Sequence, residues 1–215
     1  MNALGLIEVY SFTTAVTVGD IAAKAADVKV IAFDRNRPLS PDVPAPLVME
    51  VKIEGEVSAV EAAVEAGAAY AKEEGKFIVS HIIARPDAMT EKMAYLLDIN
   101  RDKFNKKLPK SMLGIKTPVY AEKEALGLFE ISGMVASVEA LDSMLKAADV
   151  RLIHTEKRLG GRLVTLVVTG EVSAVKASLE AAKEKASPLG KVYGINCIPC
   201  PHDEIMKFFD TERHR

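Results

Sequence analysis

Hydrophobic and polar positions along this chain change period several times, and each change predicts a new element. Residues 4–10 alternate as in a half-buried β-strand, whereas residues 14–26 place Ala and Val at helical spacing, with Asp20 and Lys24 four positions apart. Asp87 favours a helix N-cap, because its side-chain oxygen can accept from an otherwise unpaired amide. The elements predicted for the first half are strand 4–10, helix 14–26, strands 28–33 and 48–53, helix 56–74, strand 76–84 and helix 87–97.

The second half repeats this order and many of the residues. The segment ALGLIE at Ala3 returns as ALGLFE at Ala125, and KAADV at Lys24 returns at Lys146, both displaced by 122 positions. GEVSAV returns after only 115 positions, so the first copy has seven extra residues, which we place within 34–48. Such a long period indicates a duplicated domain rather than a solenoid. The elements predicted here are strand 125–131, helix 135–148, strands 150–155 and 163–169, helix 172–186, strand 191–198 and helix 202–209.

Each copy therefore reads as a β-α-β-β-α-β domain of the α+β class with a tail helix. We expect the first domain at 1–97, a connector at 98–120 and the second domain at 121–215. The connector holds six Lys or Arg residues against two Asp residues, with two prolines. We favour a solvated linker, and binding of a phosphate or an acidic partner is the alternative.

Composition narrows the classes of partner. Apolar residues make up 49% of the 215 residues and aromatic residues only 6%, with no Trp, so we expect a core of Ala, Val, Leu and Ile. A net charge of −2 gives no basis for nucleic acid as a partner, since that would need a basic face. No segment has the roughly 18 uninterrupted apolar residues that span a membrane. We therefore expect a cytoplasmic protein with no membrane partner.

Catalytic chemistry is not indicated. The four histidines are scattered outside any recognisable catalytic pattern, and no glycine-rich phosphate-binding motif occurs. Cys197 and Cys200 form a C-x-x-C pair, which is half of many zinc sites, but no second pair completes the site. Strand alternation would also point the two thiols apart. We predict no enzyme activity, no metal and no cofactor.

Taken together, the repeated motifs resemble those of bacterial microcompartment shell proteins. The resemblance rests on ALG-x-x-E, KAADV, GEVSAV, the Arg85-Pro86 pair and the Cys-Pro-His run ending at His202, and it extends along nearly all of both copies. It implies two tandem ferredoxin-like shell domains in unpermuted strand order, which assemble as a trimer that mimics a hexamer. It also implies a place in the shell of a cytoplasmic microcompartment, with other shell subunits and encapsulated enzymes as partners.

The resemblance implies contacts at the edge of a tile. In the family, the lysine that ends the first helix lies at this edge, which points to Lys24 and Lys146. The alternative is a solvated lysine that offsets the helix dipole. Arg85 matches the family's second edge residue, whereas Cys200 stands at that position in the second copy and lacks the guanidinium donors. His202 is expected at an interface or at the start of the tail helix.

The resemblance also implies a central pore, framed by the loops 35–46 and 157–162. Three chains would bring a ring of arginines to one axis, which would attract small anionic metabolites or phosphate-bearing cofactors. The alternative is that Glu156 and neighbouring acidic residues neutralise these arginines. Four prolines stiffen the first loop, so we favour fixed, partial closure over gating. The implied pore residues are Arg35, Asn36, Arg37, Pro38, Asp42, Arg158, Leu159, Gly160, Gly161 and Arg162.

A different function class stays open at this point. A trimeric ferredoxin-like protein could bind or sense a small molecule, with long loops folded over a nucleotide. That function would need a phosphate-binding glycine loop, and none is found in the sequence. The shell interpretation is therefore the one we carry forward.

Overall fold

Two compact units make up the fold. The computed structural model describes residues 2–38, 42–87, 90, 94, 124–156 and 162–209. Unit 1 consists of Met1–Tyr10, Thr14–Tyr120 and His202–Phe208, and unit 2 consists of Ser11–Thr13, Ala121–Pro201 and Phe209–Arg215. Each unit thus includes short segments from the other half of the sequence. The expected connector lies outside the described residues.

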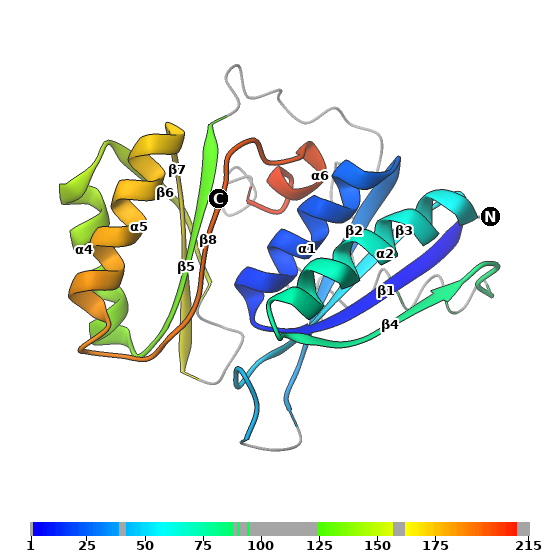
Figure 1. Cartoon of the computed structure of the whole chain (residues 1–215), viewed down its shortest axis with the longest axis horizontal. Coiled ribbons are helices and arrows are strands. Elements are labelled where there is room, and N and C mark those ends of the chain that lie inside the picture. Colours follow the sequence, from blue (N-terminus) through cyan, green and yellow to red (C-terminus); the bar gives the residue numbers. More distant parts are fainter. Residues whose placement is uncertain are drawn as a thin grey trace, which may run out of the picture. The chain divides into compact units, whose positions relative to one another are not determined.

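Unit 1 is built on an antiparallel sheet with strand order β2-β3-β1-β4 (Figure 1). Along β1, Ile7 and Val9 are buried, whereas Leu6 and Glu8 are only partly buried and lie on the opposite face, as strand alternation requires. The elements are β1 (Ala3–Tyr10), α1 (Phe12–Ala25), β2 (Val28–Asn36), β3 (Val48–Gly55), α2 (Val57–Glu73) and β4 (Phe77–Ile83).

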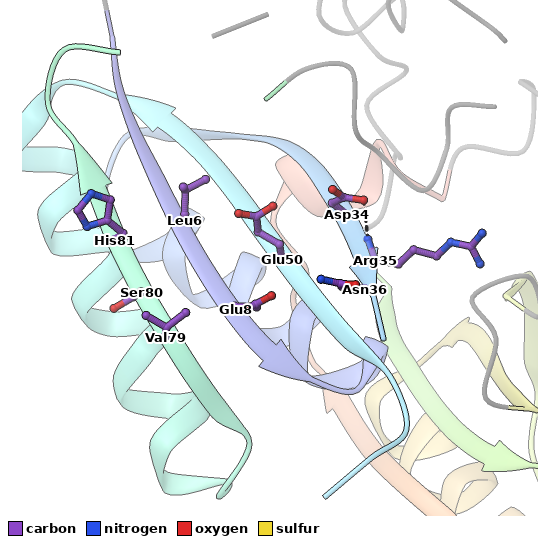
Figure 2. A pocket seen from close by; sticks show the side chains of 9 residues that line it. All are labelled: Leu6, Glu8, Asp34, Arg35, Asn36, Glu50, Val79, Ser80 and His81. Carbon is purple, nitrogen blue, oxygen red and sulfur yellow. Dashed lines mark hydrogen bonds between the residues drawn. The ribbon is translucent and has the colours of Figure 1, made fainter. Parts of the chain in front are cut away.

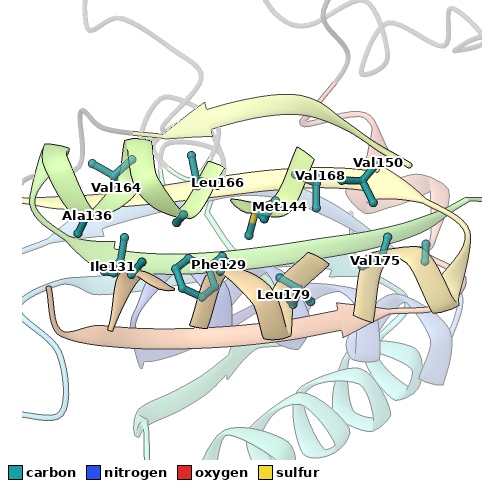
Figure 3. Packing of buried hydrophobic residues seen from close by; sticks show 14 residues of the cluster. Phe129, Ile131, Ala136, Met144, Val150, Val164, Leu166, Val168, Val175 and Leu179 are labelled. Carbon is teal, nitrogen blue, oxygen red and sulfur yellow. The ribbon is translucent and has the colours of Figure 1, made fainter. Parts of the chain in front are cut away.

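Unit 2 repeats the topology with strand order β6-β7-β5-β8. Figure 3 shows its core, in which Phe129 and Ile131 of β5 pack with Met144 of α4 and Leu179 of α5. The elements are β5 (Ala125–Ser132), α4 (Met134–Ala147), β6 (Val150–Glu156), β7 (Leu163–Gly170), α5 (Val172–Ala186) and β8 (Val192–Ile198).

The two sheets also share their irregularities. The pairing of β1 with β4 shifts register between Glu8 and Val9, and the pairing of β5 with β8 shifts between Glu130 and Ile131. These positions are equivalent in the two repeats. Residues at equivalent positions of the two units can therefore be compared directly.

Helix α6 (Asp203–Met206) follows the last strand of unit 2 in sequence but belongs to unit 1. The backbone N–H of His202 donates to Asp20 Oδ1 at 2.7 Å, and Val30 N–H donates to Glu204 Oε2 at 2.8 Å. The ring of Phe208 meets that of Phe33 edge-on, with centroids 4.8 Å apart. The C-terminal segment therefore completes the core of the first unit.

The observed elements confirm the α+β class and the duplication, with two corrections. Strand β2 continues to Asn36, three residues beyond the expected end, because Arg35 pairs with Met49 and Asn36 with Val48. Arg35 and Asn36 are therefore strand residues and not the start of a loop. The tail helix is also shorter than the expected 202–209. Most of the expected helix 87–97 lies outside the described residues.

Close packing of a helix on a sheet sets the first prediction. A Cβ added at Gly127 would lie 2.8 Å from methyl carbons of Val168 and Val175, which is closer than real contacts allow. We expect Gly127→Ala to lower the free energy of unfolding by about 1–3 kcal/mol, because β-branched neighbours cannot rotate away. Urea denaturation measures the effect, with the exposed Ser173→Ala as control. Equal midpoints for both variants would contradict this packing.

Candidate functional site

Both candidate edge lysines are paired with an aspartate one helical turn earlier. Lys24 Nζ lies 2.5 Å from Asp20 Oδ2, and Lys146 Nζ lies 2.6 Å from Asp142 Oδ2. The hydrogen bond to Asp142, followed by the charge of that carboxylate, raises the pKa of Lys146. The Lys146 side chain is 75% exposed and that of Lys24 is 42% exposed. Both ammonium groups are thus accessible at helix ends.

The other candidate edge residues occupy different settings. Arg85 and Cys200 each lie two residues after the last strand of a sheet, and both are exposed. His202 is half-buried and is the N-cap of α6, where its Nδ1 accepts from Glu204 N–H at 3.1 Å. Of the two alternatives for His202, the helix start is therefore observed, and its role at an edge stays a prediction.

The candidate pore residues that the structure describes are mostly exposed. Arg35 N–H donates to Asp34 Oδ1, and Arg37 N–H donates to Asn36 Oδ1. Pro38 is partly buried and Asp42 is exposed, whereas Arg158, Leu159, Gly160 and Gly161 lie outside the described residues. Arg162 is exposed and adopts a positive φ of 58°, and its carbonyl accepts from Gly133 N–H at 2.9 Å.

A polar depression of about 210 Å³ lies on one face of the unit 1 sheet (Figure 2). Glu8 on β1 stands directly opposite Glu50 on β3 in the strand pairing. Burial, and then the charge of Glu50, raise the pKa of Glu8 above its ordinary value. Buried Lys52 approaches Asp34 and Glu50, each at 3.5 Å. The full lining is Leu6, Glu8, Asp34, Arg35, Asn36, Glu50, Val79, Ser80 and His81.

The equivalent glutamate of unit 2 is fully buried and serves as a helix cap. Glu130 Oε2 accepts from Ser11 Oγ at 2.5 Å and from Thr13 N–H at 3.1 Å, and Oε1 accepts from Phe12 N–H at 3.4 Å. These groups form the N-terminus of α1, where unpaired amides and the helix dipole favour a negative charge. Sequence analysis missed both glutamates, although the repeated ALG-x-x-E motif placed Glu8 and Glu130 at the same position.

Metal chemistry finds no support in the described residues. Among them, no three His, Cys, Asp or Glu side chains gather in a way that could hold a metal ion. Cys197 and Cys200 are free thiols, and burial raises the pKa of Cys197. In the described part of the chain, no helix is long and apolar enough to cross a membrane.

The fold and the repeat define the class of this protein: it consists of two tandem α+β domains that share the same sheet topology. The family model described as the BMC domain matches twice, at residues 3–86 and 125–201. The chain therefore belongs to the family of bacterial microcompartment shell proteins. It is a structural protein of the microcompartment shell in the cytoplasm and not an enzyme.

Two curated relatives agree with this assignment. The carboxysome assembly protein CcmO of Synechococcus elongatus is 33% identical over 205 residues, which cover 95% of this chain and 67% of that protein. The shell protein PduA of Citrobacter freundii is 43% identical over 86 residues, which cover 40% of this chain and 91% of that protein. A crystal structure of a microcompartments protein from Desulfitobacterium hafniense shares 24% identity, covers 96% of this chain and 99% of that one, and has a TM-score of 0.38.

The buried cap gives a second prediction. Glu130→Gln keeps the size of the side chain but removes the charge that the α1 amides and the Ser11 hydroxyl stabilise. We expect a loss of about 2 kcal/mol in the free energy of unfolding, since hydrogen bonds to charged groups are the stronger kind. Chemical denaturation tests this, with the exposed Glu180→Gln as control. A Glu130→Gln protein as stable as the control would refute the capping role.

Proposed function

We propose that three copies of this chain close into a pseudohexagonal ring that tiles with other shell subunits around encapsulated enzymes. The observation that carries the proposal is the full tandem repeat, because three chains with two equivalent domains each supply six positions around one axis. Head-to-tail contacts that close on themselves give such rings. Duplication then allows the two kinds of domain to carry different edges.

Lateral contacts between rings would use the exposed helix-end lysines. Lys24 and Lys146 are each paired with an aspartate in the preceding turn, and both lysine side chains are exposed. An ammonium of this kind can reach carbonyl oxygens of a neighbour while its methylene stem covers apolar surface. Arg85 adds guanidinium donors in one kind of domain only, because Cys200 takes its place in the other. The ring would therefore present two unlike kinds of edge.

Passage through the ring would favour small anions. Arg35, Arg37 and Arg162 are exposed and lie at or near the ends of the strands that bound the two candidate pore loops. Three chains would bring such residues close to one axis, and a ring of like charges attracts ions of the opposite sign. The extra, proline-rich residues of the first loop would narrow the opening without acting as a mobile lid.

Tiling is tested with a double variant. Lys24→Ala combined with Lys146→Ala should leave the ring intact and abolish extended sheets, because both candidate edges lose their ammonium groups. Electron microscopy of the purified protein shows sheets, and sedimentation velocity measures the ring. Lys183→Ala with Lys185→Ala serves as the control, since both residues are exposed on α5. Normal sheets in the double variant would place the edge elsewhere.

Anion preference is tested with probes of opposite charge and similar size. A layer of the protein on an electrode should pass ferricyanide more readily than hexaammineruthenium. The triple change Arg35→Glu, Arg37→Glu and Arg162→Glu should lower the ratio of anion to cation current several-fold, because the sign of the field at the opening reverses.

The control for this measurement makes the same change of charge on α5. The exposed Lys176, Lys183 and Lys185 are replaced by glutamate in that variant. An equal fall in the current ratio for both variants would show that overall charge, and not a pore, governs passage.

A further inference from the structure

The two repeats differ in the exposure of the first helix after the first strand. Several side chains of α1 are buried, whereas the side chains at the equivalent positions of α4 are exposed. Helical spacing gathers the exposed ones on one apolar stripe. The pairs, with their exposed fractions, are Phe12 (1%) and Met134 (56%), Thr13 (3%) and Val135 (76%), Val16 (0%) and Val138 (61%), and Ala23 (6%) and Leu145 (48%).

The residue before α4 has a positive φ, as does the residue before α1, where the helix start contacts Glu130. Ser11, just before α1, has φ 79°, and Gly133, just before α4, has φ 91°. Gly133 is the N-cap of α4 and, having no side chain, makes no side-chain cap hydrogen bond of its own. Its first amides therefore match, in position and direction along the chain, the amides of α1 that bind Glu130 in unit 2.

The sheet of unit 1 offers the matching acceptor. Glu8 stands where Glu130 stands in the repeat, and Leu6 stands where Leu128 stands. Glu130 and Leu128 are fully buried, whereas Glu8 and Leu6 are only partly buried in the depression of Figure 2. One repeat therefore has its acceptor covered by a helix start, and the other repeat has an equivalent acceptor that remains accessible.

The neighbouring strand β4 adds an exposed apolar side chain, Val79, beside Glu8. Val79 pairs with Glu8, as Gly194 pairs with Glu130, and Val79 is 51% exposed. A Cβ at Gly194 would lie 2.8 Å from the Cβ of Thr13, so Thr13 lies directly against that strand. The residue equivalent to Thr13 is Val135. If the start of α4 lay against Glu8 as the start of α1 lies against Glu130, the exposed Val79 on the strand would face the exposed Val135 on the helix.

We propose that Glu8 of one chain binds the start of α4 of a second copy of this chain, accepting hydrogen bonds from the backbone amides of Met134 and Val135. The apolar stripe beginning at Val135 packs against Leu6 and Val79 of the first chain. This inference rests on the proposed ring and names the contact that would close it. Each chain offers α4 of unit 2 and Glu8 of unit 1, so the contact joins two unlike surfaces and is head-to-tail.

Charge supports the same pairing. Glu8 faces Glu50 directly, and burial together with that charge disfavours its ionised form in a single chain. Donor amides at a helix N-terminus favour the ionised form. Gly133 lacks the hydroxyl that Ser11 donates to Glu130. The contact between chains therefore has one hydrogen bond fewer than the contact inside unit 2, and the larger apolar stripe of α4 offsets that loss.

The test is a double-mutant cycle on the dissociation of the ring, followed by sedimentation velocity over a dilution series. Glu8→Gln removes the charged acceptor. Met134→Pro removes one donor at the first helical position of α4, where proline is tolerated. Each change should raise the dissociation constant about tenfold or more. In the double variant, the two effects should not multiply, because both remove one interaction. The exposed Glu61→Gln is the matched control.

The outcomes separate this contact from the ring itself. A wild-type chain that stays monomeric at every concentration would overturn the proposed ring. A wild-type trimer that Glu8→Gln weakens no more than Glu61→Gln does would overturn the contact and leave the ring standing. Effects that multiply fully in the double variant would also overturn it. Circular dichroism melting of each variant confirms that the monomers remain folded.

Discussion

The capping of the start of α1 by the buried carboxylate of Glu130 is the interaction on which unit 2 depends. Removing a carboxylate from water costs several kcal/mol unless donors replace the lost hydration. Here Ser11, Phe12 and Thr13 supply those donors from a helix N-terminus, so a segment from the first half of the sequence becomes part of unit 2. A single charged side chain thereby fixes the position of the helix start.

The C-terminal segment His202–Phe208, which follows unit 2 in the sequence, completes unit 1. Asp20 binds Lys24 on its own helix and also accepts from the backbone of His202, so one buried carboxylate contacts both Lys24 and the C-terminal segment. Ile205 of that segment is fully buried. The lysine that we assign to the tile edge is thus held by the same group that holds the end of the chain.

The two copies of the duplicated domain share one fold but differ in which residues are exposed. Both sheets have the same strand order and equivalent register shifts, because alternate strand residues and close glycine contacts, such as those of Gly5 and Gly127, are repeated. The surfaces differ where residues meet solvent or a partner. Val16 is buried and its equivalent Val138 is exposed, although the two lie at the same point of the repeat. A ring of threefold symmetry permits such differences, whereas six identical domains would not.

The sequence by itself determined the duplication, the order of strands and helices and the pairing of Lys24 with Asp20, because periodicity and i,i+4 spacing are local signals. Only the tertiary structure decided that β2 continues to Asn36, that α6 belongs to unit 1 and that Glu130 caps α1. Pairing with a neighbouring strand extends a strand past its own pattern. The cap joins groups more than a hundred residues apart, and no local period records which distant donors a buried charge will meet.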